Sequence, residues 1–102
     1  TDSTIVAHYQ PFITLGWTVS GKSINGNQVI DEPVTREEAL IAHTRSNAYL
    51  MFKEDDIGSL EVGKLADLVV LDQDYMTIPV DDIFGIESVL TMVGGRVVYD
   101  TL

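Results

Sequence analysis

The sequence predicts an α+β fold, and three local patterns carry this prediction. Residues 35–51 begin with Thr35-Arg-Glu-Glu38, a capping box in which each of the two outer side chains can accept the other residue's backbone N–H. Residues 68–71, Leu-Val-Val-Leu, are a short apolar run bounded by aspartates and predict a strand buried on both faces. Gly94-Gly95 lies between two apolar stretches and predicts a hairpin turn, because glycine readily adopts positive φ.

The first half of the chain predicts two helices joined by a loop. Residues 11–20 begin with proline, which a first helical turn tolerates, and end before Gly21, a typical residue after a helix. Residues 21–34 predict a loop with a turn at Asn25-Gly26, which would suit a small hairpin. The helix that begins at the capping box is expected to continue to about Met51.

The second half predicts loops and three strands. Gly63 suits a turn that needs positive φ, and residues 79–84 suit a single helical turn. Strands are expected at 67–72, 86–93 and 96–100. Together they would make one three-stranded sheet, whose edges would leave backbone groups available for further pairing.

Composition excludes several classes of function. The net charge of −10 argues against nucleic acid or an anionic membrane as a partner. The sequence has no run of 18 apolar residues and no cysteine, so it predicts neither a transmembrane helix, nor a disulfide framework, nor a thiolate zinc site. An apolar share of 45% in one short domain suggests that some apolar surface faces a partner or another part of the same protein.

The two histidines do not form a metal-binding pattern. The sequence contains no His-x-His and no His-Glu-x-x-His, so a metal site built from this chain alone is not expected. His43 is interpreted as a packing or hydrogen-bonding residue within its helix. His8 has no partner at ligand spacing, and its role stays open.

Three segments resemble the metal-dependent amidohydrolase superfamily. Residues 58–72, Gly-Ser-Leu-Glu-Val-Gly-Lys-Leu-Ala-Asp-Leu-Val-Val-Leu-Asp, are similar to the segment that follows the barrel in that superfamily. Residues 91–99 resemble its closing hairpin, and residues 35–51 its last long helix. Within that superfamily, the sequence resembles most the amidohydrolase family 3-like branch, the group with N-substituted formamide deformylase-like and exoenzyme-regulator-like proteins.

The resemblance implies a two-part fold. Residues 1–56 would be the last strand and helices of a (β/α)8 barrel. Residues 57–102 would be the C-terminal strands of a small composite β-sandwich domain, whose other strands come from the N-terminal part of the family's chain. Thr1-Asp2 and Pro11-Phe12 resemble the end of barrel strand 8 and the start of the following helix.

Asp2 therefore inherits the role of the strand-8 aspartate. The resemblance makes it the catalytic carboxylate, which takes a proton from the metal-bound water and returns it to the leaving amine, and also a candidate metal ligand. The implied cofactor is a divalent metal, with zinc as the expected ion. Because the other ligands come from earlier strands, this chain alone is expected neither to bind the catalytic metal nor to turn over substrate. No residue is assigned to substrate binding.

The resulting hypothesis is the C-terminal portion of a metal-dependent hydrolase that acts on carbon–nitrogen bonds other than peptide bonds. Its expected partners are the N-terminal barrel portion of the same protein or a second copy, and a small-molecule substrate. The expected location is cytoplasmic, without nucleic acid or membrane. The alternative is a stand-alone, non-catalytic interaction or oligomerisation domain.

Overall fold

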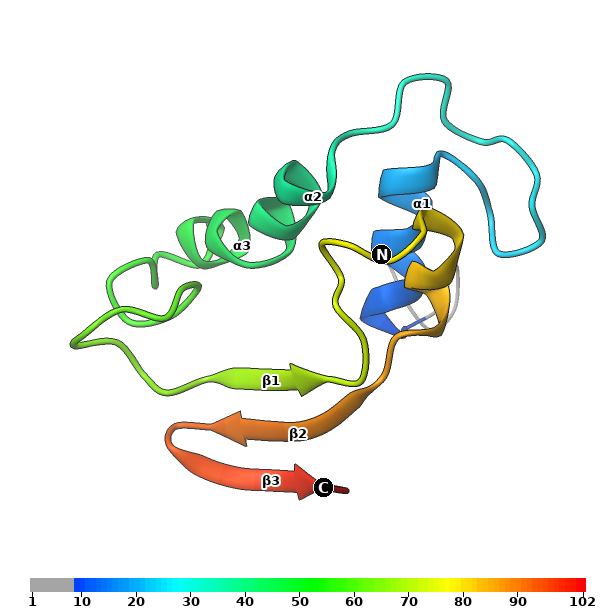
Figure 1. Ribbon diagram of the computed structural model, residues 1–102. Helices are drawn as coiled ribbons and strands as arrows, with labels where there is room; N and C mark the ends of the chain where they lie inside the picture. Colours follow the sequence, from blue (N-terminus) through cyan, green and yellow to red (C-terminus); the bar gives the residue numbers. More distant parts are fainter. Residues whose placement is uncertain (1–8) are drawn as a thin grey trace. The chain divides into compact units, whose positions relative to one another are not determined.

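The computed structural model describes residues 9–102, and Figure 1 shows their helices and strands. In chain order the elements are α1 (Pro11–Ser20), α2 (Arg36–His43), α3 (Arg45–Leu50), β1 (Leu68–Leu71), the 3-10 helix η1 (Val80–Gly85), β2 (Ser88–Val93) and β3 (Arg96–Asp100). This confirms the α+β class. The described residues form two compact units, one of residues 9–39 and 73–86 and the other of residues 40–72 and 87–102. The predicted domain boundary near residue 56 concerns the larger family fold and stays a prediction.

In the first unit, α1 packs against η1. The helix has the predicted bounds, and Gly21 ends it with a φ of 74° while donating its backbone N–H to the Trp17 carbonyl at 2.8 Å. Gly16 lies where the Phe84 ring covers the helix, and a Cβ at Gly16 would lie 2.7 Å from Phe84 Cδ1. A glycine inside this helix is therefore explained by close packing.

Tyr75 joins the start of α2 to the loop that precedes η1. Its hydroxyl donates to the Arg36 carbonyl at 2.8 Å, and Arg36 Nη1 donates to the Tyr75 carbonyl at 2.7 Å. The Tyr75 ring is buried and lies 6.5 Å from the Phe12 ring, centroid to centroid, in a tilted arrangement. Two hydrogen bonds thus join Arg36 and Tyr75, which are 39 positions apart, and the aromatic contact adds Phe12 to the same link.

The loop between α1 and α2 contains the predicted turn but not the small hairpin. Gly26 has a φ of 88° and donates to the Ser23 carbonyl at 2.9 Å. In place of two strands there is one isolated bridge, between Lys22 and Gln28. The N–H groups of residues 29 and 30 both donate to the Gly21 carbonyl, so the loop returns to the end of α1 and does not extend a ladder.

The predicted capping box is present at the start of α2. Thr35 N–H donates to Glu38 Oε2 at 3.3 Å, and Glu38 N–H donates to Thr35 Oγ1 at 3.1 Å. The prediction of one helix as far as Met51 is wrong, because Thr44 has φ −123° and ψ −80° and separates α2 from α3. Its hydroxyl donates to the Leu40 carbonyl at 2.7 Å, a threonine hydrogen bond that commonly bends helices.

The sheet of the second unit has the order β1-β2-β3 and is antiparallel throughout. Gly94 and Gly95 have φ values of 59° and 80°, which confirms the predicted two-residue turn between β2 and β3. Asp67 Oδ1 accepts the Gly94 N–H at 2.7 Å, and the Ala66 carbonyl accepts the Gly95 N–H at 3.0 Å. The loop before β1 is thus bound to the tip of the hairpin.

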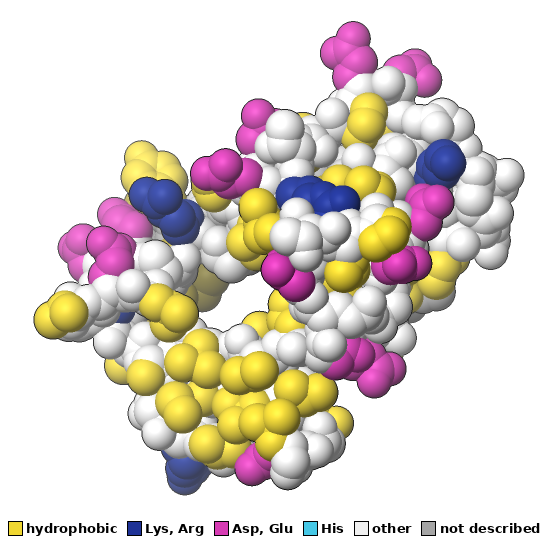
Figure 2. Space-filling model, in the orientation of Figure 1, with side chains coloured by type: hydrophobic (Ala, Val, Ile, Leu, Met, Phe, Trp, Pro, Cys, Tyr) yellow, Lys and Arg dark blue, Asp and Glu magenta, His cyan; other side chains and the backbone are white. Residues whose placement is uncertain are grey.

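The prediction that β1 is buried on both faces is wrong for this structure. Val69 is 51% exposed and Val70 is 41% exposed, although their side chains lie on opposite faces. None of the residues in the three described strands is fully buried. Figure 2 shows apolar side chains gathered over the sheet. The residues are those of an interior strand, and the second unit supplies no layer that buries them.

The remaining predictions for the second half are confirmed. The helical turn expected at 79–84 is η1, and its Ile83 side chain is fully buried. Gly63 has the positive φ, 92°, that its place in a turn predicted. The strand expected at 96–100 has the bounds of β3, and the strand expected at 86–93 begins at Ser88.

Candidate functional site

The predicted catalytic residue lies outside the described part of the chain. Asp2 and His8 both fall within residues 1–8, so their predicted roles stay predictions. Among residues 9–102, no three or more His, Cys, Asp or Glu side chains come together as a potential metal site. The described residues therefore do not fit a catalytic metal by themselves. His43 lies in the last turn of α2 and is half-buried.

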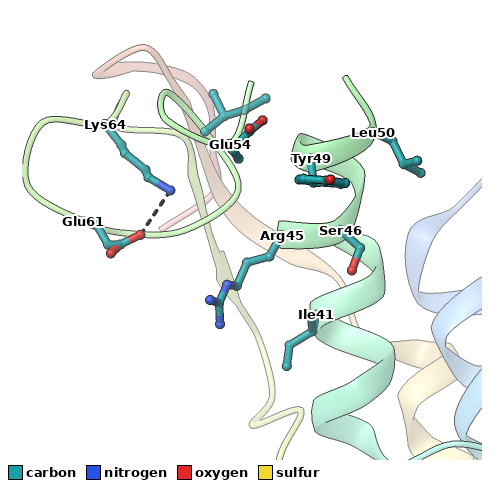
Figure 3. Close-up of a pocket in the computed structure, with 9 residues that line it drawn as sticks. Ile41, Arg45, Ser46, Tyr49, Leu50, Glu54, Glu61 and Lys64 are labelled. Atoms are coloured by element: carbon teal, nitrogen blue, oxygen red, sulfur yellow. Dashed lines mark ion pairs between the residues drawn. The ribbon is translucent and has the colours of Figure 1, made fainter. Parts of the chain in front are cut away.

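The second unit contains an open hollow of about 620 Å³ beside α3. Figure 3 shows its lining, with one side formed by the two helices and the other by the loop that follows them. The lining residues are Ile41, Arg45, Ser46, Tyr49, Leu50, Glu54, Ile57, Glu61 and Lys64. Its volume lies within the range of small-molecule sites, roughly 300–1,000 Å³.

The loop side of the hollow is a small, internally paired polar cluster. Lys64 Nζ lies 3.1 Å from Glu61 Oε2 and donates to Ser59 Oγ at 2.9 Å, and Ser59 Oγ in turn donates to the Glu61 carboxylate. The hydrogen bond from Ser59 and the interactions with Lys64 lower the pKa of Glu61. Glu61 is therefore ionised at neutral pH and suited to pairing with a cation, and poorly suited to proton transfer.

Arg45 differs from Lys64, because it has no ion pair within 4.0 Å among the described residues. Its side chain extends from α3 toward the loop that carries Glu61 (Figure 3). The hollow thus combines apolar side chains with the Arg45 guanidinium, whose charge also lowers the pKa of Glu61. Its lining contains neither a nucleophile paired with a base nor a metal-ligand set.

Sequence reasoning did not assign a site to this hollow. Ser59, Glu61 and Lys64 lie in residues 58–72, for which the sequence indicated only a family resemblance, and the helix residues were expected in one unbroken helix to about Met51. The bend at Thr44 and the loop together form the hollow, and the sequence had signalled only the loop. No helix among residues 9–102 is long and apolar enough to span a membrane.

Comparison with known families decides the chain's relationship. A sequence model of the protein family described as "Amidohydrolase family" matches residues 1–99. The chain belongs to the amidohydrolase family. The resemblance that residues 58–72 indicated is thereby confirmed, and it relates this amidohydrolase chain to enzymes that act on carbon–nitrogen bonds.

Curated relatives support the same relationship. The amidohydrolase chain is 40% identical to imidazolonepropionase of Bacteroides fragilis over 70 residues, which cover 68% of this chain and 16% of that protein. It is 32% identical over 92 residues to 5-methylthioadenosine/S-adenosylhomocysteine deaminase of Symbiobacterium thermophilum, covering 80% of this chain and 20% of the deaminase. It is 34% identical over 70 residues to N-substituted formamide deformylase of Arthrobacter pascens, covering 69% of this chain and 13% of the deformylase.

The amidohydrolase chain thus spans between about an eighth and a fifth of the length of these relatives. The search of solved structures produced no match.

Proposed function

We infer that this chain is the C-terminal portion of a metal-dependent hydrolase that acts on carbon–nitrogen bonds other than peptide bonds. The observation that carries the inference is the family match over residues 1–99, which includes Thr1-Asp2 as well as the closing hairpin. The printed names of two relatives, a deaminase and an N-substituted formamide deformylase, both describe cleavage of a carbon–nitrogen bond, which removes an amino group in the first and a formyl group on nitrogen in the second. The divalent metal, with zinc as the expected ion, would be bound mainly by residues outside this chain.

The exposed apolar surface supports a larger parent protein. Among the described residues, eight apolar side chains are buried, whereas apolar residues of all three strands are more than two-fifths exposed. A layer packed on the sheet would recover roughly 25 cal/mol for each Å² of apolar surface removed from water. In this proposal that layer comes from the N-terminal portion of the same polypeptide.

Asp2 is the residue that this proposal makes catalytic. In the complete polypeptide, its carboxylate would hold and return the proton during cleavage of the carbon–nitrogen bond. Proton transfer by a positioned side chain contributes roughly 10²- to 10⁴-fold to rate. The substitution Asp2→Asn keeps the size of the side chain and removes its basicity.

The test is steady-state kinetics of the complete polypeptide on a panel of small amides, cyclic amides and amino-substituted heterocycles. Asp2→Asn is expected to lower kcat by two to four orders of magnitude, while Asp31→Asn, an exposed loop aspartate, leaves kcat unchanged. Metal analysis of both variants separates a role of Asp2 in proton transfer from a role as metal ligand. Loss of turnover with full metal content identifies a proton-transfer residue, and loss of metal identifies a ligand. Full activity of Asp2→Asn would refute the assignment.

One observation favours the alternative, a stand-alone interaction domain. Every residue of β3 is exposed, and one edge of this strand is unpaired within the described sheet, so it could accept a strand from a partner. The mass of the native polypeptide in its source cells distinguishes the two functions. A species near 11.2 kDa supports the interaction domain, and one several times larger supports the hydrolase.

A further inference from the structure

Asn25-Gly26 forms the tip of the loop that follows α1, and this dipeptide is chemically reactive. The backbone nitrogen after an asparagine can attack the carbon of the asparagine side-chain amide. Glycine favours this attack, because without a Cβ it leaves its own nitrogen unshielded and its backbone adaptable. The chain contains three asparagines, Asn25, Asn27 and Asn47, and among them only Asn25 precedes a glycine.

The surroundings of Asn25 are open. Both Asn25 and Gly26 are exposed, and a Cβ atom at Gly26 would meet no heavy atom within 4 Å. The side-chain amide of Asn25 has no hydrogen-bond partner among residues 9–102. The structure thus leaves this side chain free to rotate toward the backbone nitrogen that follows it.

One hydrogen bond restrains the attacking nitrogen. The Gly26 N–H donates to the Ser23 carbonyl at 2.9 Å, and this bond must open before the nitrogen can lose its proton. The base of the loop is held separately, because Ser23 N–H donates to the Asn27 carbonyl at 2.9 Å and Lys22 forms a bridge with Gln28. Opening the tip therefore breaks one exposed bond, and such local openings cost far less free energy than global unfolding.

Asn47 lies in the opposite environment. Its Nδ2 donates to the His43 carbonyl at 3.2 Å. The nitrogen that follows it belongs to Ala48, which is buried and whose N–H donates to the Thr44 carbonyl at 3.1 Å. Attack at Asn47 would therefore require α3 to unfold, which makes this residue a control for the effect of the fold.

Asn27 is a control for the effect of the following residue. It is exposed and lies in the same loop as Asn25, but it precedes Gln28. The Gln28 side chain hinders approach to its own backbone nitrogen, whereas Gly26 has no side chain. Among the three asparagines, Asn25 alone combines an exposed loop with an unshielded nitrogen.

We propose that Asn25 is a site of spontaneous deamidation in the folded protein. The Gly26 nitrogen forms a bond to Asn25 Cγ, and the bond from Cγ to Nδ2 breaks. Ammonia leaves with the proton that the Gly26 nitrogen has lost, and a cyclic imide remains. A water molecule then opens the imide at one carbonyl to give aspartate, or at the other to give isoaspartate, in which the main chain runs through the former side chain.

Both products change the loop. Each adds a negative charge at neutral pH, because an ionised carboxylate replaces a neutral amide. Isoaspartate also inserts a methylene group into the main chain between Lys22 and Gln28, the two bridged residues. Because the N–H groups of Val29 and Ile30 both donate to the Gly21 carbonyl, the change lies in the segment that returns to the end of α1.

The test is peptide mapping by mass spectrometry of the complete, folded polypeptide after incubation in neutral and in mildly alkaline buffer. Asn25 is expected to convert at least about tenfold faster than Asn27 or Asn47, because its nitrogen is unshielded and only the loop tip must open. Conversion is expected to be faster in the alkaline buffer, because the attacking nitrogen must lose a proton. A free peptide of residues 20–30, incubated alongside, gives the rate without the hydrogen bonds of the folded loop.

Two variants check the chemistry. Gly26→Ala places a methyl group beside the attacking nitrogen and is expected to slow conversion of Asn25 at least about tenfold. Asn25→Gln keeps both Gly26 and an exposed amide but requires a larger ring, so conversion at this position is expected to fall below detection.

Three outcomes would overturn the proposal. The first is an intact Asn25 in the folded polypeptide over a time in which the free peptide converts, because the loop would then protect the site. The second is equal conversion at Asn25 and Asn27, and the third is conversion that Gly26→Ala leaves unchanged. None of these outcomes affects the hydrolase proposal, which rests on the family match.

Discussion

Substituting Gly16 by alanine is expected to destabilise the first unit, although alanine is the better helix former. At Gly16, a Cβ atom would lie 2.7, 2.8 and 2.9 Å from Cδ1, Cε1 and Cγ of Phe84. Heavy atoms at these distances overlap, and all three belong to the Phe84 ring, which can move away only by leaving its side-chain rotamer. Either the ring must therefore change rotamer or α1 and η1 must move apart.

Two opposing effects set the magnitude. Replacing glycine by alanine in a helix stabilises by about 1 kcal/mol. Overpacking of a well-packed contact costs about 1–3 kcal/mol. We expect the free energy of unfolding to fall by about 1 kcal/mol in Gly16→Ala. In a Phe84→Ala background the overlap disappears, so the same substitution is expected to stabilise by about 1 kcal/mol.

The assay is urea denaturation of the parent, both single variants and the double variant, analysed as a double-mutant cycle. The expected coupling is about 2 kcal/mol, well above the roughly 0.5 kcal/mol scatter of independent sites. Gly85→Ala is the matched control, because a Cβ at Gly85 meets no heavy atom within 4 Å. An additive cycle, or a Gly16→Ala chain that is more stable than the parent, would refute the packing argument.

Two further substitutions test hydrogen bonds that join distant segments. Tyr75→Phe is expected to cost about 1 kcal/mol, because the buried hydroxyl no longer donates to the Arg36 carbonyl. Burial raises the pKa of Tyr75 above its usual value near 10, so the folded chain loses stability as the pH rises through that higher value. Urea denaturation midpoints at pH 9 and above should show this loss in the parent. The loss should be smaller in Tyr75→Phe. Asp67→Ala removes the acceptor for the Gly94 N–H and is expected to cost about 1–2 kcal/mol. Faster amide exchange at Gly94, with little change at Gly21, would verify that the effect is local, and equal exchange at both would contradict it.

Local signals in the sequence predicted most of the elements. The capping box at Thr35, the stop at Gly21 and the glycine pair of the hairpin depend on residues within four positions of one another, and all three formed as expected. The same locality explains the hairpin that failed at 24–30, since its turn formed but the Gly21 carbonyl competed for the returning strand. Local chemistry predicts turns more surely than it predicts what the flanking residues bond to.

The other differences arise from interactions that the local pattern does not contain. The bend at Thr44 depends on its hydroxyl bonding to the Leu40 carbonyl, and threonine is also compatible with an unbroken helix. The apolar run of β1 correctly predicted a strand, but burial on both faces requires layers that the described chain does not supply. The hollow beside α3 depends on both the bend and the following loop, so no single pattern indicated it.

The bonds between the loop before β1 and the tip of the hairpin have a consequence for the order of folding. The β2–β3 hairpin closes around two residues, Gly94 and Gly95, which is an event of about 1–10 μs in isolated hairpins. β1 can pair with β2 only after the intervening chain, which includes η1, has been brought round, and longer loops close at greater entropic cost. Asp67 and Ala66 accept hydrogen bonds from the N–H groups of the formed turn, so these bonds are expected to set the register in which β1 pairs with β2. The last two strands would therefore act as the template, and β1, although earlier in the chain, would be the last strand to join.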